Sequence, residues 1–355
     1  MKGLILSGGF GTRLRPLTYT SAKQLIPIAN KPIIFYGIEA LVEAGITEIG
    51  IVVGDTAKEI QTVVGNGAQF GIKIEYIQQE APLGLAHAIK IARSYLKDES
   101  FIMYLGDNIL KEGVKDFVAK FESLKPNALI LLTRVCNPQE FGVAVVDEKG
   151  KVKRLIEKPK QPPSDLALVG VYLFDKEIFR AVDFIKPSWR NELEITDAIQ
   201  WLLDNNYRVE SHLVKGWWKD TGKPDDIIEA NLLVLEDIES SNKGILIESN
   251  VNGRVRIGEN TKVEKSTIRG PAVIGRNSTI INSFVGSFSS IGDNVLIQNA
   301  EIECSVVMEG AQIKNLNKRI DRSIIGKNVV ITQTDTAPRV HRFFLGDQSY
   351  VELIG

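Results

Sequence analysis

The sequence predicts two kinds of structure in one chain: an α/β domain with a mostly parallel sheet, followed by a left-handed parallel β-helix. Over residues 1–235, short runs rich in Ile and Val alternate with helical patterns, an order typical of a parallel sheet with helices on both faces. From about residue 244 the motif Ile-Gly-x-Asn recurs at a fixed spacing. A length of 355 residues also suits two domains of ordinary size.

The α/β region begins with strands and helices in alternation. Strands are expected at Lys2–Ser7, Glu48–Val53, Ile72–Ile77, Phe101–Leu105 and Ala128–Val135, with helices such as Ile33–Ala44 and Leu85–Leu96 between them. A hairpin from Val143–Val146 and Val152–Ile156, a helix at Asn191–Leu203 and a strand at Arg208–Val214 are expected further on. Such sheets bind ligands beyond the carboxyl ends of their strands, where Gly8–Arg15 and Gly106–Asn108 lie.

The β-helix is indicated by a repeat. Copies of Ile-Gly-x-Asn begin at Ile257, Ile274 and Ile291, 17 residues apart, and another begins at Ile325, two periods later. The period is close to the roughly 18 residues of a three-hexapeptide coil. We expect the isoleucines to point inward, with Gly and Asn at corners of positive φ. The predicted domains are residues 1–240 and 244–335, followed by a tail at 336–355.

Composition narrows the function classes. The 43 Lys and Arg against 44 Asp and Glu give a formal charge of −1, so no general attraction to nucleic acid is expected. No apolar run approaches the ~20 residues of a membrane helix, and the N-terminal run breaks into glycines too early for a signal peptide. Two distant cysteines offer no disulfide framework. We expect a cytoplasmic protein that binds neither nucleic acid nor membrane.

A glycine-rich turn follows the first expected strand, in Leu6-Ser7-Gly8-Gly9-Phe10-Gly11-Thr12-Arg13. Leu14 stands where a dinucleotide fingerprint needs Gly, and the Gly-Lys-Ser/Thr of a P-loop is absent. Backbone N–H groups in such a turn can face phosphate oxygens, and the cations of Arg13 and Lys23 suit a polyphosphate. Taken alone, the turn is equally consistent with an ordinary strand-to-helix connection.

Six motifs, in order along the chain, resemble those of the sugar-1-phosphate nucleotidylyltransferases. They are Gly8–Thr18, Lys23–Pro27, Leu105–Asn108, Glu157–Pro159, Glu192–Asp197 and Trp218–Gly222. With the β-helix, the whole chain resembles the long form of that family. The resemblance implies a Rossmann-like, mixed, mostly parallel sheet. It also implies a Mg²⁺-dependent reaction of a nucleoside triphosphate with a sugar 1-phosphate, and it is greatest to members that use dTTP and glucose 1-phosphate.

The resemblance implies roles for residues on the nucleotide side. Arg13 would clamp the triphosphate, Lys23 would bridge the donor and acceptor phosphates, and Asp107 with Asp220 would hold Mg²⁺, so Arg13, Lys23 and Asp107 form the catalytic set. The nucleotide-binding set is Leu6, Gly8, Gly9, Gly11, Thr12, Arg13, Gln24, Gln79 and Gly84. The Gln79 amide matches thymine or uracil but not cytosine, and Gln78 is the alternative reader if the register is shifted by one residue.

On the acceptor side the resemblance implies a sugar-phosphate pocket. Its residues are Gly142, Glu157, Lys158, Val169 and Arg190, with Glu157 accepting hydrogen bonds from sugar hydroxyls. The segment around Arg190 departs from the family pattern at Trp189 and Asn191.

Several alternatives stay open at this stage. UTP could replace dTTP, because the two bases differ by one methyl group. The β-helix could carry an acyltransferase activity, although we expect it to serve assembly of a homo-oligomer. A regulatory relative without turnover would have lost Arg13, Lys23, Asp107 or Asp220, and all four are present.

Overall fold

The fold was analysed in a computed structural model, which describes residues 1–334, 341–343 and 345–353. The chain forms two compact units. The first comprises Met1–Phe10 and Ile33–Asp220, and the second comprises Gly11–Pro32 and Thr221–Gly355. Residues 11–32 therefore belong with the C-terminal part, whereas the boundaries at 240, 244 and 336 remain predictions from sequence. None of the helices in the described ranges is long and apolar enough to span a membrane.

The first unit, described in full, is built on a mixed sheet with the strand order β10-β9-β11-β6-β1-β4-β5, to which β8 and β12 add beside β11. The strands are β1 (Lys2–Ser7), β4 (Glu48–Val53), β5 (Lys73–Gln78), β6 (Phe101–Leu105), β8 (Ala128–Arg134), β9 (Gly142–Val146), β10 (Val152–Glu157), β11 (Leu166–Phe174) and β12 (Val209–Leu213). The four strands β5, β4, β1 and β6 run parallel, so their carboxyl ends share one edge. The predicted mixed, mostly parallel sheet is confirmed.

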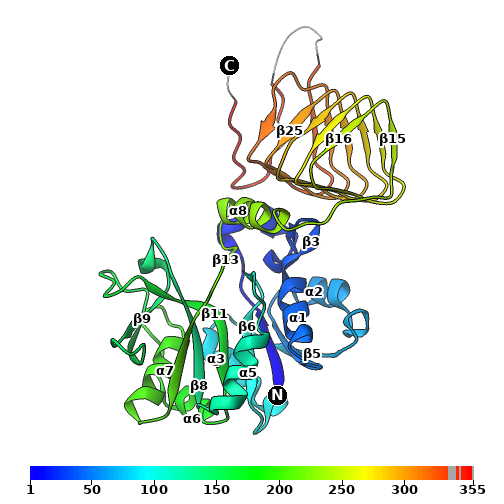
Figure 1. Cartoon of the computed structure of the whole chain (residues 1–355). Helices are drawn as coiled ribbons and strands as arrows, with labels where there is room; N and C mark the ends of the chain where they lie inside the picture. Colours follow the sequence, from blue (N-terminus) through cyan, green and yellow to red (C-terminus); the bar gives the residue numbers. More distant parts are fainter. Residues whose placement is uncertain (335–340, 344, 354–355) are drawn as a thin grey trace. The chain divides into compact units, whose positions relative to one another are not determined.

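Helices cover both faces of this sheet. They are α1 (Ile33–Glu43), α2 (Ala57–Val64), α3 (Leu85–Ile91), α4 (Arg93–Leu96), α5 (Lys115–Leu124), α6 (Ile178–Phe184) and α7 (Ile195–Asp204), most of them labelled in Figure 1. One face of the sheet buries Leu4, Leu6 and Met103 in an apolar core with α3, α6 and α7. On the other face Gly3 and Tyr104 lie against α1, since a Cβ at Gly3 would stand 3.1 Å from Leu41 Cδ1 and one at Gly37 3.0 Å from Tyr104 Cε1.

The helices differ from the sequence expectations in two places. The helix expected over Leu85–Leu96 is interrupted at Ala92, between α3 and α4. The helix expected from Asn191 begins only at Ile195, because Glu194 is extended with φ −79° and ψ 140° and the segment before it pairs with a turn. A two-stranded sheet of β7 (Asn108–Leu110) and β13 (Trp218–Asp220), which the sequence analysis did not predict, completes the unit.

The second unit contains the short strands β2 (Pro27–Ile28) and β3 (Lys31–Pro32), helix α8 (Pro224–Leu235) and the β-helix (Figure 1). Its described residues form three parallel sheets of six, six and five strands. The first sheet has β14 (Ser241–Asn242), β17 (Val255–Ile257), β20 (Ala272–Ile274), β23 (Ser289–Ile291), β26 (Val306–Val307) and β29 (Ile324–Ile325). The second has β15 (Ile245–Ile247), β18 (Lys262–Glu264), β21 (Thr279–Ile281), β24 (Leu296–Gln298), β27 (Gln312–Lys314) and β30 (Val330–Thr332). The third has β16 (Asn250–Asn252), β19 (Thr267–Arg269), β22 (Phe284–Val285), β25 (Glu301–Glu303) and β28 (Ile320–Asp321). The predicted β-helix is confirmed.

The repeat places Ile and Asn as predicted, but not Gly. Ile257, Ile274, Ile291 and Ile325 are buried, and the Asn of each copy is at positive φ, between 53° and 58°. The repeat glycines are not at positive φ, which corrects the prediction. Gly258, Gly275 and Gly292 are needed for the spacing of the coils instead, because a Cβ at each would collide with the next coil; at Gly258 it would lie 2.7 Å from the carbonyl carbon of Gly275.

Candidate functional site

The glycine turn begins at the carboxyl end of β1, between two parallel neighbours. Leu6 is buried in the sheet, and the turn continues through Gly8 and Gly9. Gly8 lies against the predicted base reader, because a Cβ there would stand 2.6 Å from Gln79 Oε1. Gln79 directly follows β5, and its N–H donates to the carbonyl of Val53 at 2.8 Å. The absence of a side chain at position 8 is therefore what admits the amide.

Gln79 is 7% exposed, and its amide has a defined orientation. Its Nε2 lies 3.0 Å from Nδ1 of His87 on α3. Burial, followed by the charge of Lys90, lowers the pKa of His87, so the ring is neutral near pH 7 and Nδ1 accepts a hydrogen bond when the ring proton is on Nε2. Gln78 is exposed, and its amide donates to the carbonyl of Gly54 at 3.4 Å, so the glutamine that contacts the glycine turn is Gln79. His87 was not predicted from the sequence as the partner of this amide.

Gly84, one of the predicted nucleotide-binding residues, lies against Leu193 of the Glu192–Asp197 motif. It precedes α3 with φ 103°, and a Cβ there would collide with the backbone of Leu193. The N–H of Leu193 donates to the carbonyl of Leu83 at 2.7 Å, and the N–H of Ala86 donates to the carbonyl of Leu193 at 3.0 Å. These two bonds explain why the chain before Ile195 is not helical, and the close approach of Leu193 explains why only glycine suits position 84.

The two predicted metal ligands lie together. Asp107 follows β6, and Asp220 ends β13, where it pairs in register with Asn108, the residue next to Asp107. Asp107 is 8% exposed and accepts from Asn108 Nδ2 at 3.0 Å, while Trp218 Nε1 donates to Asn108 Oδ1 at 2.6 Å. This role of Asn108, which follows Asp107 in the chain and pairs with the strand that carries Asp220, was not predicted from the sequence.

The donor set fits Mg²⁺. Among the described residues, no group of three or more His, Cys, Asp or Glu side chains is placed to hold a metal. Two carboxylates with hard oxygen ligands suit Mg²⁺, which keeps several waters and takes further oxygens from substrate phosphates. Asp107 and Asp220 are the residues that would hold it.

The predicted acceptor residues also gather within the first unit. Gly142 and Glu157 are register partners in the β9–β10 hairpin, and Val169 is buried in β11. Thr196 Oγ1 donates to Glu157 Oε2 at 3.1 Å. Burial raises the pKa of Glu157, and the nearby charge of Glu194 raises it further. Lys158 continues from β10 with φ 40°, and its N–H donates to the carbonyl of Phe141 at 3.1 Å.

Arg190 lies beside Glu157 and is surrounded by carboxylates. Its guanidinium is 3.5 Å from Glu157, 3.4 Å from Glu194 and 2.7 Å from Glu192. Neither Glu192 nor Glu194 was among the predicted site residues. Because this arginine is already paired, its predicted contact with a phosphate requires it to give up at least one of these carboxylates.

The remaining predicted nucleotide residues belong to the second unit. Gly11 has φ 63°, Thr12 and Arg13 are exposed, and Lys23 begins a 3₁₀ turn. A Cβ at Gly11 would stand 3.1 Å from Lys23 Cβ, so Gly11 and Lys23 are in contact. Gln24 is buried, and its Oε1 has no hydrogen-bond partner among the residues that the structure describes.

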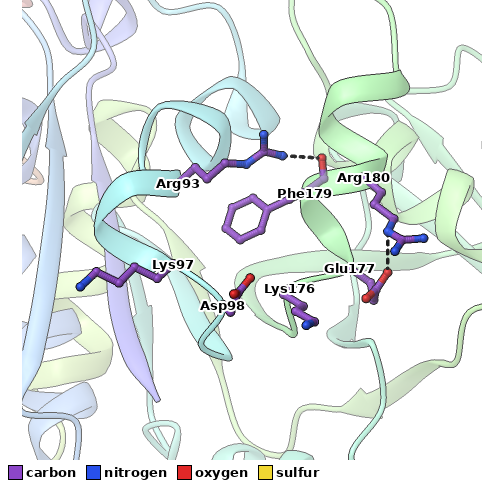
Figure 2. A pocket seen from close by; sticks show the side chains of 7 residues that line it. All are labelled: Arg93, Lys97, Asp98, Lys176, Glu177, Phe179 and Arg180. Carbon is purple, nitrogen blue, oxygen red and sulfur yellow. Dashed lines mark hydrogen bonds and ion pairs between the residues drawn. The ribbon is translucent and has the colours of Figure 1, made fainter.

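A cavity of about 380 Å³ lies elsewhere in the first unit, between α4 and α6 (Figure 2). Four cations line it, those of Arg93, Lys97, Lys176 and Arg180. Its residues flank the start of β6, whereas Gly8, Gln79 and Asp107 follow the carboxyl ends of the parallel strands. None of the predicted site residues lines this cavity.

Comparisons with known proteins identify the family. Residues 2–237 match the nucleotidyl transferase family. The chain is 52% identical to a glucose-1-phosphate thymidylyltransferase of Streptomyces antibioticus over 99% of both chains. It is 49% identical to the low-salt glycan biosynthesis nucleotidyltransferase of Haloferax volcanii over 99% of this chain and 100% of that one. A crystal structure of a putative glucose-1-phosphate thymidylyltransferase from Bacillus anthracis, in complex with a sucrose, superimposes with a TM-score of 0.64 at 34% identity, covering 68% of this chain and 98% of that one.

Proposed function

Because the chain belongs to the nucleotidyl transferase family, we propose that it transfers a thymidylyl group from dTTP to α-D-glucose 1-phosphate. A phosphate oxygen of the sugar 1-phosphate attacks the α-phosphorus in line. The bond from the α-phosphorus to the bridging oxygen of the β-phosphate breaks, so the products are dTDP-glucose and pyrophosphate. The choice of dTTP and glucose follows the name of the 52% identical Streptomyces relative.

One observation carries the proposal. Gln79 and Gly8 directly follow β5 and β1, and Asp107 stands two residues after the end of β6; these strands belong to a set of four parallel, adjacent strands, so the three residues lie at one edge of the sheet. The edge thus brings together an amide that matches thymine, a turn open to phosphate and a carboxylate for Mg²⁺. Asp220 joins Asp107 through its register with Asn108. An ordinary strand-to-helix connection would have no need for these groups together.

The residues of the chain act mainly by position and charge. Gln79 holds the base through a donor and an acceptor, while Arg13 and Lys23 neutralise the phosphates, which repel each other when brought close. Mg²⁺ on Asp107 and Asp220 would supply additional positive charge to the phosphate oxygens. On the acceptor side, Glu157 orients the sugar hydroxyls, and Lys158 and Arg190 hold the sugar phosphate. Gln24 Oε1, buried without a partner among the described residues, supports a polar ligand beside it.

UTP is the second candidate nucleotide, since the Gln79 amide meets an edge that thymine and uracil share. Pyrophosphate release across a matrix of triphosphates and sugar 1-phosphates decides between them. We expect the highest kcat/KM with dTTP and glucose 1-phosphate, and little turnover with dCTP. A clear preference for UTP would replace thymidylyl by uridylyl transfer, and no release with any pair would contradict the proposed reaction.

The β-helix has a separate alternative, an acyltransferase activity. Its residues 244–334 contain no histidine to act as a general base. We propose that it serves assembly into a homo-oligomer, to be measured by light scattering of the whole chain. Acetyl transfer to an amino sugar phosphate by the intact protein would overturn this proposal.

A further inference from the structure

We propose that Asn231 is a positioning residue for nucleotidyl transfer, through which the β-helix fixes the hairpin that follows Lys23 and Gln24. The inference rests on the proposed function, because Lys23 is there assigned to the phosphates. It gives the β-helix a part in turnover, besides any part in assembly. All the residues concerned belong to the second unit.

The hairpin of β2 and β3 has a demanding turn. Its two central residues, Ala29 and Asn30, have φ 48° and 63°. Positive φ at two successive positions matches the twist of a tight hairpin, but glycine or asparagine normally takes these positions. An alanine persists there only when surrounding contacts determine the conformation. The conformation of the turn therefore depends on the residues that contact it.

Asn231 of α8 makes the main hydrogen bonds that hold this turn in place. It is 1% exposed, and its Oδ1 accepts from the N–H of Ala29 at 2.9 Å and from Oγ of Ser290 at 2.6 Å. Its Nδ2 donates to the carbonyl of Phe288 at 3.0 Å. One buried side chain thus ties the hairpin to α8 and to the coil of the β-helix at residues 288–290. Removing it leaves buried polar groups unpaired, which costs more than the loss of an exposed hydrogen bond.

Two further contacts fasten the same turn. Asn30 Nδ2 donates to the carbonyl of Ile291 at 2.5 Å. Ala29 packs against a small apolar core formed by Leu235, Ile238, Val273 and the ring of Phe288. The hairpin is therefore held by hydrogen bonds and by apolar packing to the same part of the β-helix.

The hairpin directly continues the segment that carries Lys23. The N–H of Ile26 donates to the carbonyl of Lys23 at 3.2 Å, and Ile26 and Ile28 are buried. Lys23 in turn contacts Gly11, whose carbonyl accepts from Thr18 Oγ1 at 2.7 Å. A displacement of the hairpin would therefore also displace Lys23 and the neighbouring Gly11. A displacement of about 1 Å in a catalytic group can lower turnover on the order of 100-fold.

Asn231→Ala and Asn30→Gly test the inference in the whole protein. Glycine at position 30 keeps the positive φ but loses the bond to Ile291. The matched control is Ser278→Ala, since Ser278 is likewise buried in the β-helix and its Oγ donates to the carbonyl of Gly292 at 2.9 Å, but it makes no hydrogen bond to the hairpin. We expect kcat to fall about tenfold or more in Asn231→Ala. The KM for glucose 1-phosphate should change less than about twofold, and the control should keep the wild-type kcat.

Hydrogen exchange at the Ala29 amide gives a second readout, because its donor bond ends on Asn231. The amide should exchange faster in Asn231→Ala and at the wild-type rate in Ser278→Ala. If Asn231→Ala does not fold, Ser290→Ala removes one of the same bonds and carries the test together with Asn30→Gly.

The variant Lys23→Ala distinguishes a failure of this inference from a failure of the proposed function. If Lys23→Ala lowers kcat but the Asn231, Asn30 and Ser290 variants do not, the inference is overturned and the proposed function stands. If Lys23→Ala itself leaves kcat unchanged, the role of Lys23 in the proposed function is wrong, and the inference fails with it. An equal loss of kcat in Ser278→Ala would show general damage to the β-helix and would also overturn the inference.

Discussion

The amide oxygen of Gln79 lies against Gly8, so close that a Cβ on residue 8 would stand 2.6 Å from it. The contact joins the end of β5 to the end of β1 across β4, which lies between them in the sheet. It couples the part of the site proposed to read the base with the part proposed to receive the phosphates. The nearby Asp107–Asp220 pair then completes the edge at β6.

Gly8→Ala should weaken dTTP binding, because the new methyl group displaces the Gln79 amide. We expect the KM for dTTP to rise about tenfold, the equivalent of one lost hydrogen bond of ~1.4 kcal/mol. Initial rates at saturating glucose 1-phosphate measure this. Gly346→Ala is the control, since a Cβ there meets no atom within 4 Å. An unchanged KM for dTTP in Gly8→Ala would contradict the role of Gln79 in base recognition.

Acidification should weaken dTTP binding through His87. Burial and Lys90 lower the pKa of His87, so at neutral pH the ring accepts from the Gln79 amide, and it gains its proton at a lower pH than an ordinary histidine does. A protonated ring can no longer accept, so the amide must rotate and lose its match to thymine. The profile of kcat/KM for dTTP should fall at this acidic pH, and His87→Phe should remove that step. An identical acidic step in both proteins would contradict the interpretation.

Asp107→Asn and Asp220→Asn should each reduce kcat by about 100-fold or more, because an amide is a weaker ligand for Mg²⁺ than a carboxylate. Half-saturation should shift to higher Mg²⁺ concentration in both variants. Asp98→Asn, outside the site, should behave as the wild type. Circular dichroism checks that the fold is retained. If all three variants show the same dependence of activity on Mg²⁺ concentration, the two aspartates are not the metal ligands.

As pH falls, the KM for glucose 1-phosphate should begin to rise at a higher pH than it would if the glutamate had its ordinary pKa. Burial and Glu194 raise the pKa of Glu157, so as pH falls this carboxylate gains its proton early and stops accepting from sugar hydroxyls. The same raised pKa means that folding favours the protonated form, so its contribution to stability declines as pH rises through the shifted pKa. Glu157→Gln should raise the KM and flatten its pH profile. A profile unchanged by the substitution would contradict the role of Glu157.

The regular parts of the fold were predictable because local patterns determine them. The strand Glu48–Val53 was predicted with its observed bounds, and the 17-residue repeat gave the β-helix. The non-helical segment before Ile195 was missed, since its conformation depends on bonds between Leu193 and the turn at residues 83–86. The β7–β13 pairing was missed for the same reason. Its strands are three residues long, and the paired residues Leu110 and Trp218 are 108 residues apart, so the pairing leaves no local signal in the sequence.

The site was predicted from motifs, and the structure adds the contacts between them. Gln79 was proposed as a reader, but its neighbours Gly8 and His87 come from other elements, so no sequence spacing reveals them. Arg190 was proposed as a phosphate ligand, but the carboxylates of Glu192 and Glu194 around it were not foreseen. Motifs identify residue types, whereas partners depend on tertiary packing.

The central claim is that Asp107 and Asp220 share a metal ion with the triphosphate. The most direct measurement is a crystal structure of the protein soaked with dTTP and Mn²⁺, whose anomalous scattering locates the ion in place of Mg²⁺. We predict one peak in direct contact with an oxygen of each aspartate and with phosphate oxygens, next to the turn at Gly8. A bound nucleotide with no peak between the two aspartates, or a peak held by other residues, would contradict the claim.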